Sequence, residues 1–362
     1  MMKSVCLALA LGLLAALSEA QDPTTYQVER EYKLQLKAEA LLRKEWTRNL
    51  FADPDQDRWR VQLRPRLEAS VRWFRLGVGG DFNHSSDKNV ELAPGLPLRD
   101  NYDSRDARLD LAFAGLETRF VRIEGGRFRM PVALTEMLWD RDLRPQGAAV
   151  TVRTSGNSGR FSATALGARG SHSLDDDDAE MLLLSATADL PSGPKTRLEL
   201  TGSYLAFRKI AGIEPRLRRQ NNRAAGGGFA HDYHVLDGIV RLRNEGNVPT
   251  QLVAEYSKNT SVDTQGRGLW LAVILGSVKA SRSRLEYTYA SVDRDATLAA
   301  YAGDDFFWQT GWEGHRGDLG VRASDRSSLH AIAQLIRFKD AARTDEQEHW
   351  IRRYRVELRF DY

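Results

Sequence analysis

Arginine recurs at even spacing in two stretches of the chain. These arginines are Arg58, Arg60, Arg64 and Arg66 in one stretch, and Arg353, Arg355 and Arg359 in the other. A guanidinium stays charged at any physiological pH and hydrogen-bonds oxyanions through a rigid fork of donors, so a row of them beside water can attract anions. Acids on the same face could instead neutralise the row and merely solvate and stiffen a polar wall. Both interpretations stay open, although arginines outnumber acids on this face.

The last nine residues show what kind of element carries these arginines. Aromatic or aliphatic side chains occupy the even positions Tyr354, Val356, Leu358, Phe360 and Tyr362, and charged side chains occupy the odd ones. A period of two predicts a strand with one apolar and one ionic face. The ionic face must contact water. One side of a soluble sandwich would allow this, but a last strand ending in an aromatic residue also resembles the assembly signal of outer-membrane barrels, which the barrel-assembly machinery recognises.

Sixteen segments of the chain show a strand pattern. The first, 32–45, could also be a helix because it is rich in Glu, Lys, Leu and Ala, but its alternation favours a strand. In the second, Pro65 should forfeit a ladder hydrogen bond. The predicted strands are 32–45, 58–71, 74–82, 107–115, 120–126, 148–153, 160–168, 181–190, 197–206, 235–243, 251–257, 269–278, 284–291, 314–323, 329–338 and 350–362.

The connections between these segments alternate between short, turn-forming sequences and long polar ones. Segments such as 191–194 and 244–247 are short, whereas 84–106, 127–147 and 207–234 are long. Transmembrane barrels have this pattern, with short periplasmic turns and long extracellular loops. We therefore predict an all-β, transmembrane antiparallel barrel of about sixteen strands, with both termini at the periplasmic end. A barrel of this size encloses a water-filled lumen.

The N-terminus has the pattern of a secretory signal. Lys3 precedes an apolar run, and the small residues Ser18 and Ala20 fit cleavage before Gln21. We expect a signal peptide at 1–20, a barrel domain at 21–362 and a location in the bacterial outer membrane. The single cysteine, Cys6, would leave with the signal peptide, so the mature chain could form no disulfide. The mean hydropathy of −0.47 is compatible with a transmembrane barrel, because barrel strands alternate apolar and polar residues and the average over both is low.

One long connection carries a motif. It contains Gly126-Arg127-Phe128-Arg129-Met130-Pro131 and then Trp139-Asp140-Arg141-Asp142-Leu143-Arg144-Pro145-Gln146-Gly147. This segment resembles that of a family of bacterial outer-membrane porins related to the phosphate-selective porins. The resemblance implies a channel for small hydrophilic or anionic solutes, in which the third loop folds inward and narrows the pore. The implied constriction residues are Arg127, Arg129, Asp140, Arg141, Asp142 and Arg144, and analogy with porins suggests a homotrimer.

Other signals are weak. The acidic run 175–178 lacks the spacing of a calcium loop, and the basic segment 216–223 could contact lipopolysaccharide phosphates or a solute but is more simply an exposed loop. Gly226-Gly227-Gly228 predicts flexibility only. No motif places a nucleophile beside a base, so we expect no catalytic residue, cofactor, metal site or nucleic-acid partner. A barrel hydrolase and an adhesive or structural barrel remain the alternatives to a channel.

Overall fold

The computed structural model describes residues 32–48, 55–86, 105–156, 159–169, 179–213, 222–225, 228–303, 305–306, 310–339 and 350–362. The predicted signal peptide at 1–20 and the acidic run at 175–178 lie outside these ranges, as does most of the basic segment 216–223. Within the described ranges, no helix is long and apolar enough to cross a membrane.

Sixteen antiparallel strands form one closed barrel, as predicted. The segment 32–45, for which a helix was the competing prediction, belongs to a strand that continues to Arg48. The barrel strands are β1 (Tyr32–Arg48), β2 (Gln56–Val71), β3 (Phe74–Ser85), β4 (Arg105–Glu117), β5 (Val121–Arg127), β6 (Gln146–Gly156), β7 (Gly159–Arg169), β8 (Glu180–Gly193), β9 (Thr196–Arg208), β12 (Tyr233–Asn244), β13 (Thr250–Asn259), β14 (Arg267–Ser277), β15 (Ser283–Val292), β16 (Trp312–Ser324), β17 (Ser327–Phe338) and β18 (Ile351–Asp361).

Four smaller elements lie in the described parts of the long connections. Two short strands, β10 (Ala224–Ala225) and β11 (Gly228–Phe229), pair with each other outside the barrel. Gly228 is therefore part of a strand, although the glycine run predicted only flexibility. Two 3-10 turns, η1 (Ile210–Gly212) and η2 (Ala299–Tyr301), complete the set. The lengths of the connections alternate as predicted, with seven short turns at one end of the barrel and eight longer connections at the other.

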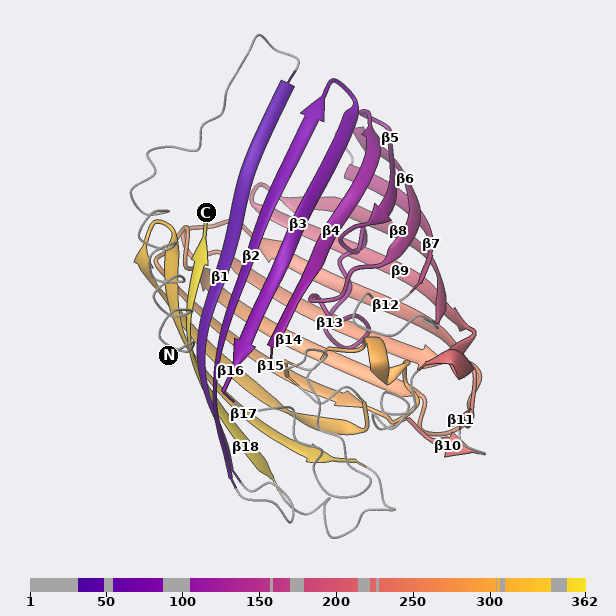
Figure 1. Cartoon of the computed structure of the whole chain (residues 1–362), viewed down its shortest axis with the longest axis vertical. Helices are drawn as coiled ribbons and strands as arrows, with labels where there is room; N and C mark the ends of the chain where they lie inside the picture. Colours follow the sequence, from indigo (N-terminus) through magenta and orange to yellow (C-terminus); the bar gives the residue numbers. More distant parts are fainter. Residues whose placement is uncertain are drawn as a thin grey trace.

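The barrel closes where β1 pairs with β18. The register runs from Glu39 opposite Asp361 to Arg48 opposite Arg352, and Figure 1 shows the indigo β1 beside the yellow β18. Tyr362 continues this ladder, because its N–H donates to the Ala38 carbonyl at 2.8 Å and its carbonyl accepts from Ala38 N–H at 3.0 Å. The sheet therefore has no free edge at the seam, as a barrel in lipid requires.

Alternation separates an apolar outer face from a charged inner one. On β18, the outward-facing Tyr354 and Val356 are 43% and 42% exposed. The alternating arginines Arg353 and Arg355, which face inward, are only 1% and 3% exposed. Leu358, Phe360 and Tyr362 follow on the outer side and are partly covered. Exposed leucines, valines and aromatics continue around the other strands. Such an apolar outer surface is typical of a transmembrane barrel.

Pro65 interrupts the pairing of β2 with β3, as predicted. The two strands pair up to Leu63 opposite Phe82 and again from Arg66 opposite Gly79, with no pair at the two residues between. On the far side of β3, the pairing with β4 shifts between Gly79 and Gly80. Proline lacks the N–H that a central ladder position needs, so the gap and the bulge fall beside it.

The apolar core of the protein lies inside the barrel, where two long connections fold inward. The third connection, 128–145, buries Leu138 and Trp139, and the connection 293–311 buries Tyr301. Trp139 stacks on Tyr301 with ring centroids 5.7 Å apart, and Tyr301 stacks on Phe207 of β9 at 5.5 Å. The sequence indicated an inward fold for the third connection only. Both connections pack against the inner wall, and a charged cavity remains beside them.

Candidate functional site

A cavity of about 750 Å³ lies between the third connection and the wall that β1, β2, β17 and β18 form. Charged groups dominate its lining, with ten arginines and eight carboxylates. The arginines are Arg43, Arg60, Arg64, Arg129, Arg141, Arg144, Arg284, Arg316, Arg355 and Arg359, and the acids are Glu39, Glu136, Asp142, Glu286, Asp305, Asp318, Glu357 and Asp361.

The seven wall arginines singled out from the sequence all lie at inward-facing strand positions. Arg60, Arg64, Arg355 and Arg359 line the cavity. Each of these has a polar partner. Arg60 donates to Asn83 at 2.8 Å and Arg64 to Asp81 at 3.1 Å, while Arg355 donates to Glu45 and Arg359 to Glu357, both at 2.5 Å. Arg66 pairs with Glu39 of β1. The row of arginines is thus largely neutralised along the wall.

Glu45 of β1 is the centre of the remaining wall network. Its carboxylate accepts from Arg58 at 3.0 Å, Arg353 at 3.0 Å and Arg355 at 2.5 Å. The side chain of Glu45 is only 5% exposed. Burying a carboxylate is costly unless cations and hydrogen bonds compensate it, and three arginines do so here. One acid therefore holds side chains of β1, β2 and β18 together across the seam.

Three of the predicted constriction residues project from the third connection into the cavity. Arg129 lies 3.3 Å from Glu39, and Arg141 lies 2.9 Å from Asp305, with side-chain exposures of 51% and 57%. Asp142 lies 2.7 Å from Arg64 of β2. Burial disfavours the ionised form of Asp142, but the attraction of Arg64 outweighs it, so the pKa of Asp142 lies well below its usual range.

Arg144 lines the same cavity but is mainly an anchor for the third connection. Its guanidinium contacts Asp110 of β4 at 3.1 Å through Nε and at 3.2 Å through Nη2. It also donates from Nη1 to the carbonyl oxygen of Arg141 at 2.6 Å. Arg144 is 3% exposed. Its bonds therefore set the path of the backbone that presents Arg141 and Asp142.

Two of the predicted constriction residues lie elsewhere. Asp140 is 3% exposed and accepts the Asp142 N–H at 2.8 Å, so it shapes the turn instead of facing the cavity. Arg127 still belongs to β5, and strand alternation places it on the outer face with Ile123, which is 42% exposed. There Arg127 donates to the Leu109 carbonyl at 2.7 Å and to Gln146 at 3.1 Å. The strand β5 ends one residue later than predicted, at Arg127 and not at residue 126, so Arg127 belongs to the strand and not to the loop.

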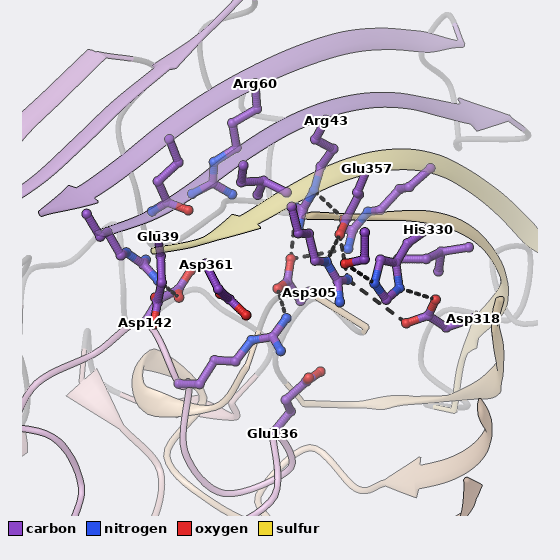
Figure 2. A pocket seen from close by; sticks show the side chains of 18 of the residues that line it. Glu39, Arg43, Arg60, Glu136, Asp142, Asp305, Asp318, His330, Glu357 and Asp361 are labelled. Atoms are coloured by element: carbon purple, nitrogen blue, oxygen red, sulfur yellow. Dashed lines mark hydrogen bonds and ion pairs between the residues drawn. The ribbon is translucent and has the colours of Figure 1, made fainter. Parts of the chain in front are cut away.

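No sequence pattern predicted the acid at the middle of the cavity. Asp305, from the connection 293–311, lies 2.9 Å from Arg43 and 3.2 Å from Arg355. Figure 2 shows Asp305 between the wall residues Arg43 and Glu357 and the third-connection residue Glu136. Burial opposes its ionisation, but Arg43 and the other arginines outweigh burial and hold the pKa of Asp305 well below its usual range. The alternation of polar and apolar residues along β1 could have identified Arg43 as an inward-facing residue. Asp305 lies in a connection, where no such alternation exists.

A second charged network lies across the cavity on β15, β16 and β17. Arg316 contacts Glu136 of the third connection and Glu286, both at 2.9 Å. His330 Nδ1 lies 2.8 Å from Asp318, which Arg284 approaches at 3.3 Å. The third connection is therefore tied to both sides of the lumen. Since arginines exceed carboxylates by two in the lining, the cavity as a whole carries a small positive excess from these groups.

Comparison with known proteins shows the fold. No family model matches the chain, and no curated protein matches it. Among solved structures, Pseudomonas putida OprB matches with a TM-score of 0.61 and 10% identity, over 92% of this chain and 94% of that one. Salmonella typhi OmpF, in a complex with daunomycin, matches with a TM-score of 0.55 and 13% identity, over 92% and 98%. A Rhodopseudomonas blastica porin variant matches with a TM-score of 0.51 and 10% identity, over 91% and 100%.

At such low identities these matches establish a porin-like sixteen-stranded barrel and leave the solute open. The motif in the third connection is compatible with this fold, because the connection lies inside the lumen. Selectivity for phosphate has no support in the matched structures. The charges along the cavity are therefore the basis for any statement about function.

Proposed function

We propose that the protein is a porin of the bacterial outer membrane that lets small hydrophilic solutes diffuse through a water-filled channel. The observation that carries the proposal is the charged cavity inside a closed barrel, bounded by the third connection. Charged side chains on an inner barrel wall remain hydrated only if water enters the lumen. An outer face of exposed leucine, valine and aromatic side chains would in turn lie in lipid.

We further propose that the channel prefers anions modestly. Arg129 and Arg141 expose about half of their side chains beside the cavity, whereas the acids Asp142 and Glu136 are only 12% and 16% exposed. Along the third connection a passing ion would thus meet guanidinium groups more directly than carboxylates, whereas the wall acids Glu39 and Asp361, which are 41% and 61% exposed, would oppose the preference. Acids paired with the wall arginines limit the preference, and salt screens charges over about 8 Å at physiological ionic strength.

The test is reconstitution of the purified, folded protein in planar bilayers. Single-channel conductance should appear in steps, and the reversal potential in a potassium chloride gradient should have the sign expected for chloride preference. The preference should weaken as salt is raised, because screening increases. A folded protein that inserts without conducting would contradict the channel, and a preference for potassium would contradict the anion preference alone.

The remaining partners are proposals by analogy with porins. The aromatic-ended strand β18 would be the signal for the barrel-assembly machinery, and the outer ends of the strands would contact lipopolysaccharide. A homotrimer is the proposed assembly. Native mass spectrometry of the detergent-extracted protein would measure the number of copies and any retained lipopolysaccharide, and a monomer as the only species would contradict the trimer.

A further inference from the structure

Three arginines from separate parts of the chain converge on the carboxylate of Asp305. Arg43 of β1 lies 2.9 Å and Arg355 of β18 3.2 Å from Oδ1, while Arg141 of the third connection lies 2.9 Å from Oδ2. Both oxygens therefore receive charge-assisted contacts, which are shorter and stronger than neutral hydrogen bonds. The three guanidinium groups are arranged to hold a carboxylate.

Contacts other than these ion pairs keep Asp305 in place. Gln334 of β17 donates from Nε2 to the Asp305 carbonyl at 2.8 Å. The next residue, Phe306, is 1% exposed, with its ring 5.6 Å from that of Trp270 and the Arg316 guanidinium 4.9 Å above it. The backbone at Asp305 is thus held by packing, and its carboxylate is a tethered group that fills the arginine site.

The site would survive loss of the Asp305 carboxylate. Arg43 also contacts Glu357 at 2.7 Å, and Arg355 also contacts Glu45 at 2.5 Å. These second contacts hold two of the arginines in their present orientation whether or not Asp305 is there. The cavity lining would then hold ten arginines and seven carboxylates. A vacated site would be preorganised and positively charged, which is what favours binding of an anion.

We propose that Arg43, Arg141 and Arg355 form a binding site for the carboxylate group of a small monoanionic solute, and that Asp305 occupies this site as a tethered competitor. The inference rests on the proposed channel function, since a solute must reach the cavity. Displacement of the Asp305 side chain by a solute carboxylate would preserve the same contacts. Asp305 thereby keeps the solute from binding too tightly to leave.

The surrounding charges favour one carboxylate over a larger or more highly charged anion. The contacts are made to two oxygens of one planar group, whereas tetrahedral phosphate carries further oxygens. Glu357 and Glu45 lie on the wall behind the arginines, and Glu136 faces the cavity from the third connection. A second negative charge on the solute would be repelled by these acids.

The test is Asp305→Ala with acetate as the probe. Reconstituted channels should show a saturable reduction of the chloride current as acetate is added, because acetate replaces the missing side chain. A tethered group acts as a competitor at millimolar effective concentration or above, so acetate should act on the variant at a concentration at least about tenfold lower than on the natural protein. Inorganic phosphate should act on the variant more weakly than acetate.

Asp318→Ala is the matched control. Asp318 also lines the cavity, but its partners are His330, Arg284 and Arg359, and none of these belongs to the proposed site. This variant should therefore respond to acetate as the natural protein does. Heat-modifiable migration in gel electrophoresis checks that each variant is folded. Equal responses to acetate in folded Asp305→Ala and the natural protein would overturn the proposal, as would a stronger response of the variant to phosphate.

A second measurement separates this proposal from the channel proposal. Trifluoroacetate binding to the detergent-solubilised proteins can be followed by fluorine NMR without any current. Tighter binding to Asp305→Ala than to the natural protein would support the site even if neither conducts, a result that would overturn the channel alone. Equal binding by both proteins would overturn the site.

Discussion

Asp142 of the third connection and Arg64 of β2 are joined by an ion pair of 2.7 Å between Oδ1 and Nη1. Their side chains are 12% and 11% exposed, and Arg64 also contacts Asp81 at 3.1 Å. The pair connects a loop that lies inside the lumen to the barrel wall. It therefore ties the loop to the wall beside the cavity.

The first prediction is that Asp142→Ala loosens the third connection. A hydrogen bond to a charged group contributes about 1.5–3 kcal/mol, and Asp81 would still compensate Arg64, so the barrel should fold. Single-channel records should show noisier and, on average, larger conductance than the natural protein. Asp325→Ala is the control, since Asp325 lies in a short turn with its side chain 98% exposed. Indistinguishable records from the two variants would show that the ion pair does not hold the loop.

The second prediction concerns pH. The pKa values of Asp142 and Asp305 are both lowered, so their contribution to stability is present above the ordinary aspartate pKa of about 4 and is lost as pH falls through the lowered values. Conductance noise that depends on these ion pairs should therefore stay constant from neutral pH down to about pH 5. Records at stepwise lower pH provide the measurement. A rise in conductance noise between about pH 7 and pH 5 would contradict the prediction.

The third prediction distinguishes two arginines that the sequence grouped together. Arg141→Gln removes a charge that is 57% exposed beside the cavity, and should move the reversal potential toward cation preference. The shift should be larger at low salt, since the screening length rises from about 8 Å to about 30 Å between 0.15 M and 0.01 M. Arg127→Gln is the control and should leave the potential unchanged, because Arg127 contacts Leu109 and Gln146 on the outer face. Equal shifts would mean that the passage does not run beside Arg141.

The fourth prediction concerns assembly. Phe360→Ser with Tyr362→Ser should reduce membrane insertion, because the outer face of β18 loses apolar surface where the barrel closes on β1. Tyr362 also lies under the Arg326 guanidinium, 4.6 Å from its ring centroid. Arg326→Ala should have a smaller effect, since it leaves the apolar face and the Tyr362–Ala38 backbone pair intact. The measurement is the fraction of heat-modifiable protein in the membrane, and normal insertion of the double variant would count against the prediction.

Alternation made most of the barrel predictable from the sequence. Arg64 and Arg66 share a face with Arg58 because the side-chain period of a strand is two, and no tertiary information is needed to see it. Arg127 was harder to place, since a strand that extends one residue beyond its predicted end carries this side chain on its outer face and not in the loop. Asp305 was not predictable, because its position depends on contacts with Arg43, some 262 residues away in the chain, and not on any local period.

The fifth prediction concerns Glu45, the acid that three arginines share. Glu45→Gln would leave Arg58, Arg353 and Arg355 close together without the carboxylate they surround. Removing one partner from a buried ion pair costs about 3–5 kcal/mol, because the remaining charges stay buried. The variant barrel should lose its heat-modifiable form at a lower temperature than the natural protein.

The matched control for this variant is Glu68→Gln, which removes an acid from a more exposed pair. Glu68 lies 3.0 Å from Lys37, with side-chain exposures of 20% and 39%, and an exposed pair contributes about 0–1 kcal/mol. Folded Glu45→Gln channels should also favour chloride more strongly than Glu68→Gln channels, because uncompensated arginines would remain beside the cavity-lining Arg355. If the two variants unfold at the same temperature, the three arginines at the seam must be compensated by groups other than Glu45.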